Sequence, residues 1–355
     1  MLFTKLRKKA SPTSIHAKIE GKAADTPSGV DWSEKLGQEL GDAKLSYNPP
    51  NSAEFQGRRC TFFFITGVGK SGTNWLGNVL NLHPSVYVDP GEFQFQTLWN
   101  QGLKALSGPS WQSAHRAPYK QAAEMGMIDT VRRTLLAGVA NKPGVGIIGD
   151  KRPRFFSVLV PGCPIINLVR DGRDVMVSYT YHYLRLQPGN MQWWNDDLKQ
   201  HFPPFSERFH AAADDDAKKD VAAERLSQEW WLIHAADMWA SRVKADRENI
   251  AKASVDSPET PVMILRYEDL HANFEAKRAE IYRFIGADPS LAEDPSEDSR
   301  TSPGFRKERV MGFYRKGQPG DWKRYRNEVF DRVVSEHVAE SLLAEGYELE
   351  TNESK

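Results

Sequence analysis

The sequence predicts an α/β fold in which helices cover a central parallel sheet, and two observations support this prediction. Four short apolar runs, residues 61–66, 145–149, 164–169 and 261–266, each suit a strand, and residues 61–66 fit a strand that is buried on both faces. A segment of helical character lies somewhere after each run. Strands that alternate with helices along a chain are typical of parallel α/β sheets.

The first strand and the first helix enclose a glycine-rich turn. The run "TFFFIT" (61–66) is continuously apolar and ends at the glycines of "GVGKSG". Apolar residues at helical spacing follow the turn: Trp75, Leu76, Val79, Leu80 and Leu82. Strand, glycine turn and helix make the first half of a βαβ unit.

The later helices follow the other strands. The segment "DGRDVMVSYTYHYLR" comes after residues 164–169, and "YEDLHANFEAKRAEIYRFIG" comes after residues 261–266. Residues 211–253 are predicted to form one or two long helices with tryptophans in the core, and residues 328–345 a final amphipathic helix. The aromatic, proline-interrupted segment 186–210 suits a substrate lid or an inserted packing element, and the sequence leaves both open.

Composition argues against several classes of function. The chain has 355 residues, with 40% apolar and 26% charged, enough for one large α/β domain or two small ones. The 47 Lys and Arg residues equal the 47 Asp and Glu residues, which gives no reason to expect binding to nucleic acid or membranes. No apolar run approaches the roughly 18 residues of a membrane-spanning helix. The histidines and cysteines lack metal-ligand spacing, so we expect no metal.

The chain divides into an arm, a domain and a tail. Residues 1–57 are polar and suit a flexible N-terminal arm, residues 58–346 the domain, and residues 347–355 a C-terminal tail. The basic start, "MLFTKLRKKASPTSIHAK", lacks an apolar core and suits a solvated tail, with a transit peptide as the alternative. Cys60 and Cys163 lie beside apolar runs, which favours buried thiols and a cytoplasmic location.

The turn after the first strand has the features of an anion site. Gly67, Gly69 and Gly72 allow backbone N–H groups to point toward one position. The turn also opens a helix, whose N-terminus favours negative charge. Further donors in and after the turn are Lys70, Ser71, Thr73 and Asn74.

A nucleotide-hydrolase loop is one alternative for this turn. The pattern GxxxxGK[ST] is met at "GKS", but its first glycine would fall on Phe64. A kinase would also need a strand-end Asp for magnesium, and Asp150 could serve. On these residues alone, a P-loop kinase stays open.

Two later segments contain cations that suit a second phosphate. "LVRDGRDVMVSYTYH" places Arg170, Asp174 and Ser178 at i, i+4 and i+8. An arginine at a strand end can clamp a phosphate together with a helical serine, although a surface Arg–Asp pair explains the spacing equally well. "RKGQPGDWKRY" puts Arg315 and Lys316 before a glycine whose backbone can approach an anion closely.

Together these segments resemble the nucleotide motifs of sulfotransferases that use 3′-phosphoadenosine 5′-phosphosulfate (PAPS). "KSGTNWL" resembles the 5′-phosphosulfate loop, which reads Lys-Ser-Gly-Thr-Thr-Trp in the cytosolic branch. The second segment matches Arg-x-x-x-Asp-x-x-x-Ser, and "RKGQPGDWK" matches the late motif Arg-Lys-Gly-x-x-Gly-Asp-Trp-Lys. "RYEDL" (266–270) is also similar. The resemblance covers about residues 58–346 and implies a P-loop-like, three-layer α/β/α domain with a central parallel sheet.

The resemblance also implies a role for each matched residue. The 5′-phosphosulfate would be held by Lys70, Ser71, Gly72, Thr73 and Asn74, with Asn74 replacing a threonine. Trp75 and Tyr267 would contact the adenine. The 3′-phosphate would be bound by Arg170, Ser178, Arg315, Lys316 and Gly317.

The base that accepts the acceptor's proton differs from that of the cytosolic branch. That branch has a histidine in a Lys-Thr-His segment, where "GDKRPRFF" has an arginine. The carbohydrate branch has a Glu soon after the first helix and a Lys-x-Pro segment with a catalytic-site lysine, matched here by Glu92, Lys151 and Pro153. Aromatic neighbours can raise the pKa of a Glu toward that of a general base. Glu92 as a simple helix cap, or His182 or Asp89 as the base, are alternatives.

We therefore expect a PAPS-dependent sulfotransferase that acts on a hydroxyl, or less readily an amine, by in-line displacement and releases 3′-phosphoadenosine 5′-phosphate (PAP). Lys70 would stabilise the bridging oxygen, and the single negative charge on the sulfuryl group makes a metal less necessary than in phosphoryl transfer. The acceptor would be a small molecule or a carbohydrate, and a homodimer stays open. The alternatives are a P-loop kinase and a non-catalytic nucleotide-binding protein.

Overall fold

The structure is a computed structural model, and it describes residues 51–91, 101–102, 104–112, 116–152, 162–186, 196–256, 258–295, 301, 308–312 and 315–349. The chain divides into two compact units, Met1–Ser46 and Tyr47–Lys355. Every described residue belongs to the second unit, so the fold and the site are those of this unit.

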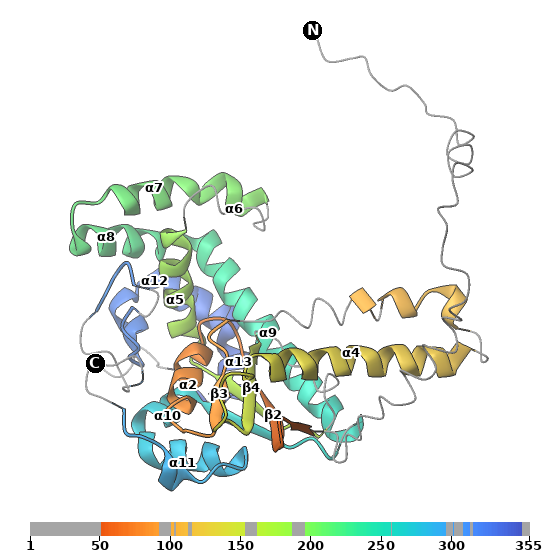
Figure 1. The fold of residues 1–355 in the computed structure, drawn as a ribbon. Coiled ribbons are helices and arrows are strands. Elements are labelled where there is room, and N and C mark those ends of the chain that lie inside the picture. Colours follow the sequence, from red (N-terminus) through yellow and green to blue (C-terminus); the bar gives the residue numbers. More distant parts are fainter. Residues whose placement is uncertain are drawn as a thin grey trace, which may run out of the picture. The chain divides into compact units, whose positions relative to one another are not determined.

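A central sheet organises the described residues (Figure 1). Five strands lie in the order β3-β4-β2-β5-β6 and run parallel, and β1 pairs with β2 in the antiparallel sense. The strands are β1 (Ser52–Phe55), β2 (Arg58–Thr66), β3 (Val86–Val88), β4 (Ile147–Arg152), β5 (Ile165–Val169) and β6 (Val262–Arg266). The four apolar runs correspond to β2, β4, β5 and β6, so the predicted parallel α/β sheet is confirmed. Strand β1 lies within the range predicted as an arm.

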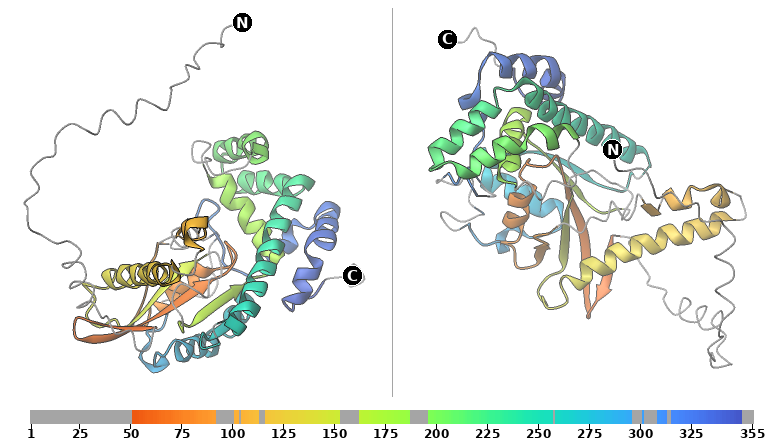
Figure 2. Two further views of the ribbon diagram at one scale, coloured as in Figure 1. Left: turned by 90° about the vertical axis from the view of Figure 1, so that its right-hand side faces the viewer. Right: turned by 90° about the horizontal axis from the view of Figure 1, so that it is seen from above.

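Helices cover both faces of the sheet and give the predicted three layers. One layer is α2 (Thr73–Leu80), α10 (Tyr267–Ala272) and α11 (Phe274–Phe284). The other includes α4 (Ala117–Ala137) and α9 (Glu229–Asp256). In the right-hand view of Figure 2 the strands lie between α2 and α11 on one side and α4 on the other.

Side chains that alternate between the two faces of the sheet explain why β2 is buried on both faces. Phe63 and Ile65 pack with α2, α10 and α11, whereas Phe62 and Phe64 pack with α4. Opposite Phe63, strand β4 has Gly149, and a Cβ atom there would lie 2.3 Å from the Phe63 ring. A continuous apolar strand therefore needs a glycine in its neighbour to accommodate its aromatic side chains.

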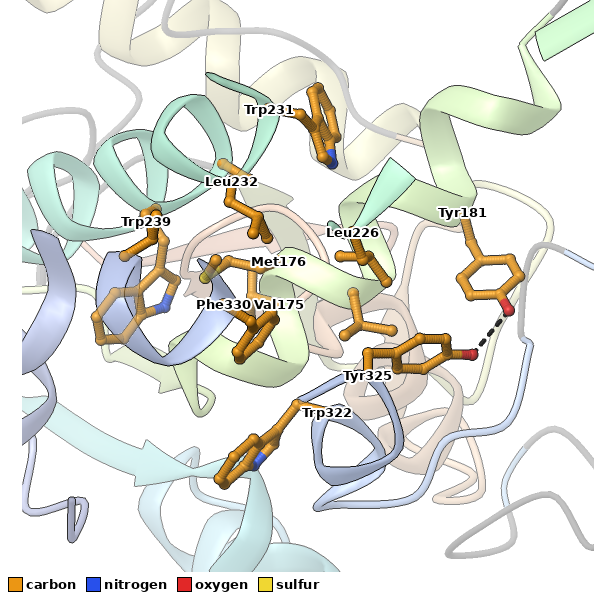
Figure 3. Close-up of a cluster of buried hydrophobic side chains, with 14 of the residues drawn as sticks. Val175, Met176, Tyr181, Leu226, Trp231, Leu232, Trp239, Trp322, Tyr325 and Phe330 are labelled. Atoms are coloured by element: carbon orange, nitrogen blue, oxygen red, sulfur yellow. Dashed lines mark hydrogen bonds between the residues drawn. The ribbon is translucent and has the colours of Figure 1, made fainter. Parts of the chain in front are cut away.

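A second core lies among the helices that follow β5 (Figure 3). It joins α5 (Gly172–Arg185), α7 (Pro203–Ala211), α8 (Asp215–Arg225) and α9. The indole N–H of Trp231 donates to Oγ1 of Thr180 at 2.8 Å, and the hydroxyls of Tyr181 and Tyr325 are 2.8 Å apart. Trp231 and Trp239 are fully buried, whereas Trp230 is partly exposed, so the prediction of core tryptophans in residues 211–253 is confirmed for two of the three.

The remaining described elements are short, apart from the C-terminal helical run. The predicted helix 328–345 is observed as α12, a π-helical segment and α13 in succession. The elements are α6 (Asp196–His201), η3 (Pro109–Trp111), η6 (Pro289–Leu291), η7 (Asp321–Tyr325), α12 (Glu328–Val333), η8 (Val334–Val338) and α13 (Ala339–Ala344). Cys60 and Cys163 are buried free thiols, as predicted. Within the described ranges, no helix has the length and apolar character needed to cross a membrane.

Candidate active site

The turn between β2 and α2 has an unusual backbone. Gly67 and Gly72 have φ angles of 152° and 101°, and Lys70 has a φ of 72°. The N–H of Ser71 donates to the carbonyl of Val68 at 3.0 Å and closes the turn. A left-handed conformation costs a non-glycine residue about 1 kcal/mol, and such strain is concentrated at functional sites. The conformation of Lys70 is thus a local sign of function.

Each glycine of this turn lies against another part of the predicted site. A Cβ atom on Gly69 would be 2.5 Å from the hydroxyl of Tyr179 on α5, and one on Gly72 would be 2.7 Å from the ring of Tyr267. A Cβ atom on Gly67 would be 2.3 Å from the backbone of β5. The glycines therefore let three segments that are distant in sequence approach the turn closely.

Arg170, directly after β5, connects the first turn to the late motif. Its guanidinium donates to the carbonyl oxygens of Lys70 at 3.4 Å and Gln318 at 3.3 Å. It also pairs with Asp174 at 3.6 Å and lies 4.6 Å from the centroid of the Tyr267 ring. One buried cation thus contacts every motif that the sequence assigned to the nucleotide site.

Tyr267 and Trp75 form an aromatic wall beside these segments. The Tyr267 hydroxyl donates to the carbonyl of Gly317 at 2.6 Å, and burial raises the pKa of this tyrosine to about 12, so it stays protonated. The Trp75 ring meets Tyr267 edge-on at 5.1 Å and stacks on Phe274 at 5.9 Å. The indole N–H of Trp75 donates to the carbonyl of Thr301 at 3.2 Å.

The late motif holds its cations by shared carboxylates. Arg315 pairs with Glu308 and Asp321, and Lys316 contacts Asp321 at 2.8 Å. Burial alone would raise the pKa of Asp321, but Arg315 and Lys316 lower it below its ordinary value. Gly317 has a φ of 65°, a conformation that suits glycine.

The polar residues that begin α2 lie at the mouth of the same turn. Thr73 and Asn74 are its first two helical residues and are partly buried, while the Ser71 hydroxyl is fully buried. Ser178 lies partly buried on α5, two turns beyond Arg170. The close approach of Tyr179 to Gly69 brings the middle of α5 against the first turn.

Lys151 binds the segment that leads toward Glu92. Its ammonium donates to three consecutive carbonyl oxygens, those of Asp89 at 2.6 Å, Pro90 at 2.9 Å and Gly91 at 3.1 Å. Glu92, the predicted base, lies outside the described residues. Pro153 of the predicted Lys-x-Pro segment does so as well.

The two alternative bases have different surroundings. The Asp89 carboxylate accepts hydrogen bonds from the N–H of Gly91 at 2.7 Å and the hydroxyl of Tyr87 at 3.2 Å, which fix its own turn. His182 lies on α5 within electrostatic reach of Lys70. Burial, followed by Lys70 and Arg185, lowers the pKa of His182 to about 3, so its imidazole is neutral at neutral pH.

Sequence reasoning missed the contacts made through backbone carbonyls. Arg170 bonds to the carbonyls of Lys70 and Gln318, and Tyr267 bonds to that of Gly317. Every residue type has a carbonyl, so no sequence signal marks these partners. Asp321 was matched as part of the late motif, but its pairing with Arg315 and Lys316 was not predicted, although it follows these cations closely in "RKGQPGDW".

Comparison with known proteins identifies the family of this chain. The family model described as "Sulfotransferase domain" matches residues 61–342. The fold and the clustered motifs are thus those of a group-transfer enzyme, and the chain belongs to the sulfotransferase family.

The chain is similar to individual sulfotransferases over part of its length. Sulfotransferase 1E1 of Homo sapiens is 25% identical over 205 residues, covering 51% of this chain and 57% of that protein. Sulfotransferase 1E1 of Cavia porcellus is 22% identical over the same number of residues, with 51% and 56% covered. The chain spans about half the length of these curated relatives. Among solved structures, mouse sulfotransferase SULT7A1 complexed with PAP is 15% identical, with 83% of this chain and 96% of that chain covered and a TM-score of 0.39.

Proposed function

We propose that this chain transfers a sulfuryl group from PAPS to an acceptor hydroxyl, or less readily to an amine, and releases PAP. One observation carries the proposal. The Arg170 guanidinium donates to the backbone of both the first turn and the late motif while it lies over Tyr267. Three motifs separated by long stretches of sequence therefore converge on one position.

The residues at this position fit a nucleotide with anionic groups at two ends. The buried Oγ of Ser71 and Nε of Arg170 have no hydrogen-bond partner among the described residues. Buried polar atoms normally have partners, so donors of this kind suit an added phosphate or sulfate oxygen. Gly69 and Gly72 let Tyr179 and Tyr267 approach the turn closely, and backbone N–H groups of such glycine-rich turns bind anions.

We assign the binding roles along these lines. The first turn would hold the 5′-phosphosulfate through Lys70, Ser71, Gly72, Thr73 and Asn74. The 3′-phosphate would be bound by Arg170, Ser178, Arg315, Lys316 and Gly317. Trp75 and Tyr267, whose rings are 5.1 Å apart, would contact the adenine.

The bound donor supplies an activated sulfuryl group that passes to the acceptor by in-line displacement. Lys70 would stabilise the negative charge that develops on the bridging oxygen, because its ammonium is held in a turn that is already strained into place. We propose no metal for this step. Within the described part of the chain, no group of three or more His, Cys, Asp and Glu side chains is placed to hold one.

We propose Glu92 as the general base, with Lys151 as the residue that positions it. The three carbonyls that Lys151 binds belong to residues 89–91, which directly precede Glu92. Asp89 is less suited, because its carboxylate is occupied by Gly91 and Tyr87. His182 is the remaining alternative, since its neutral imidazole lies near Lys70.

Calorimetric titration with PAP tests the nucleotide site. A charged hydrogen bond contributes about 1.5–3 kcal/mol, so Arg170→Ala, Arg315→Ala and Lys316→Met should each weaken PAP binding by about 10-fold or more. Lys316→Met is included in case the arginine variants unfold. Lys316 is more exposed than Arg170 and Arg315, so its replacement should disturb the fold least. The control is Arg332→Ala, whose partner is Glu229 on α9. Unchanged PAP affinity in all three site variants would refute the assignment.

Two other functions are separable by assay. A P-loop kinase would require ATP and magnesium and would not use the sulfate donor, but its candidate ligand Asp150 is fully buried in β4. A non-catalytic binding protein would bind PAP without turnover of any acceptor. We propose a small-molecule or carbohydrate acceptor, with a homodimer as an open assembly. The buried free thiols favour the cytoplasm.

A further inference from the structure

We propose that the acceptor carries an anionic group, such as a carboxylate, sulfate or phosphate, and that Arg185 binds this group. The inference rests on the proposed function, because it concerns the substrate that would receive the sulfuryl group. It goes further by naming a residue outside the nucleotide motifs and a chemical class for the acceptor.

Helix α5 places Arg185 beyond the reacting end of the donor site. Ser178, His182 and Arg185 are spaced i, i+4 and i+7, so they lie along one side of the helix. At the beginning of this stripe, Tyr179 touches the first turn at Gly69. Ser178, the first residue of the stripe, is therefore the neighbour in sequence of the residue that contacts the first turn.

Electrostatic contacts place these groups close together. His182 is within reach of Lys70 on one side and Arg185 on the other. Arg185 in turn is repelled by Arg315, and burial together with this repulsion lowers the pKa of Arg185 to about 10. Lys70 and Arg185 thus place positive charge near a neutral imidazole, and Arg315 lies near Arg185.

Arg185 differs from the other cations of the site in its partners. Arg170 has Asp174, and Arg315 and Lys316 share Asp321. Among the described residues, no carboxylate lies within ion-pair distance of Arg185. Its described hydrogen-bond partner is a neutral group, the carbonyl of Gly312. The bond to Gly312 uses only part of a guanidinium that has five N–H donors.

A partly buried charge without a counter-ion is unfavourable, and an anionic ligand would relieve the cost. The nucleotide is not expected to do so, because its phosphates are assigned to residues of the first turn, Arg170 and the late motif. The anionic group that pairs with Arg185 would then belong to the acceptor. The alternative is that Arg185 only holds residues 308–312 against α5, which requires no anionic ligand. The two possibilities differ in whether Arg185 makes the protein prefer an anionic acceptor.

The test uses the full chain saturated with PAP, so that the nucleotide cations are filled. Matched probes that differ only in charge are titrated by calorimetry: 4-hydroxyphenylacetate against 4-hydroxyphenylacetamide, and glucuronate against glucuronamide. A charged hydrogen bond predicts about 10-fold tighter binding of the carboxylate in each pair. Arg185→Gln should remove the difference. Arg208→Gln, an exposed arginine on α7 paired with Glu224, should keep it.

The outcomes separate this inference from the proposed function. Three results would each overturn the inference. The first is that the amides bind as well as the carboxylates or better, and the second is that no carboxylate binds at millimolar concentration. The third is a preference for the carboxylate that survives in Arg185→Gln. Failure of PAP itself to bind in the first titration would overturn the proposed function. If Arg185→Gln unfolds, as judged by its melting curve, Arg185→Lys serves instead. It should keep the carboxylate preference in weakened form, and an undiminished preference would count against Arg185.

Discussion

The carboxylate of Asp174 accepts a hydrogen bond from the backbone N–H of Gly320 at 2.7 Å. The same carboxylate accepts from the N–H of Trp322 at 3.0 Å and pairs with Arg170. The acid of the Arg-x-x-x-Asp-x-x-x-Ser segment therefore attaches the late motif to α5. This contact keeps Arg315 and Lys316 close to Arg170, so the two halves of the proposed 3′-phosphate pocket depend on one buried side chain.

Asp174→Ala should destabilise the protein and weaken PAP binding together. The change leaves Arg170 and two backbone N–H groups buried without their partner, which costs about 3–5 kcal/mol of unfolding free energy. Urea unfolding and PAP titration measure the two effects. Asp331→Ala is the control, because its pair with Arg326 is partly exposed and should contribute within about 1 kcal/mol. Equal stability losses in the two variants would contradict the docking role.

Comparing Lys70→Gly with Lys70→Met should separate the backbone strain at residue 70 from the contribution of its ammonium to turnover. Both remove the ammonium, so both should lower turnover by about 100-fold or more, the scale of an electrostatic stabiliser. Only methionine retains the cost of the left-handed conformation. The glycine variant should thus be more stable than the methionine variant by about 1 kcal/mol. Thermal unfolding checks this order, and a methionine variant as stable as the glycine variant would show that the turn stores no strain.

Lys151→Met and Glu92→Gln should act on the same step. Glu92→Gln is expected to lower turnover by about 100-fold while PAP affinity stays the same. Lys151→Met removes the bonds to residues 89–91 and should also lower turnover without changing PAP affinity. The double variant should lose little more than Glu92→Gln alone, because residues that act as a unit are not additive.

The control for this cycle is Lys142→Met, a lysine whose ammonium lies 4.7 Å from the Tyr87 ring centroid. It should keep full turnover, since it does not contact residues 89–91. Losses that multiply in the double variant would mean that Lys151 and Glu92 work independently. A fully active Glu92→Gln would transfer the role of base to His182.

Stability should fall as the pH is lowered from about 6.5 toward 3, and His182 should contribute to the fall. Burial, Lys70 and Arg185 lower its pKa to about 3, below the ordinary histidine value of 6.5. In this window the unfolded chain binds a proton that the folded chain does not, so acid favours unfolding. His182→Asn should flatten the dependence between pH 6.5 and 4 in urea unfolding. A slope in His182→Asn equal to that of the unsubstituted protein would contradict the prediction.

The sequence predicted the sheet well because burial leaves a strong signal. Each of β2, β4, β5 and β6 contains part of a short apolar run that is bordered by turn residues in the sequence. The three-residue β3 and the four-residue β1 were not predicted. β3 is too short to show a period, and the four residues of β1, SAEF, form no apolar run.

The site was predictable where charge and glycine coincide, and unpredictable where contacts are made to the backbone. Lys70, Arg170 and Arg315 stand out because they adjoin glycines or strand ends. The contact of Tyr179 with Gly69 and that of Arg185 with Gly312 depend on how α5 lies against distant segments. Only the folded chain brings such partners together, so spacing in the sequence does not reveal them.

The bridge from Arg170 to the carbonyls of Lys70 and Gln318 has a consequence for synthesis of the protein. A ribosome must complete the late motif before the first turn acquires its full set of neighbours, although that turn emerges about 250 residues earlier, long before translation ends. A nascent chain would thus have little affinity for the nucleotide. Free nucleotide in the cell would act on the finished molecule and protect that form from unfolding by mass action.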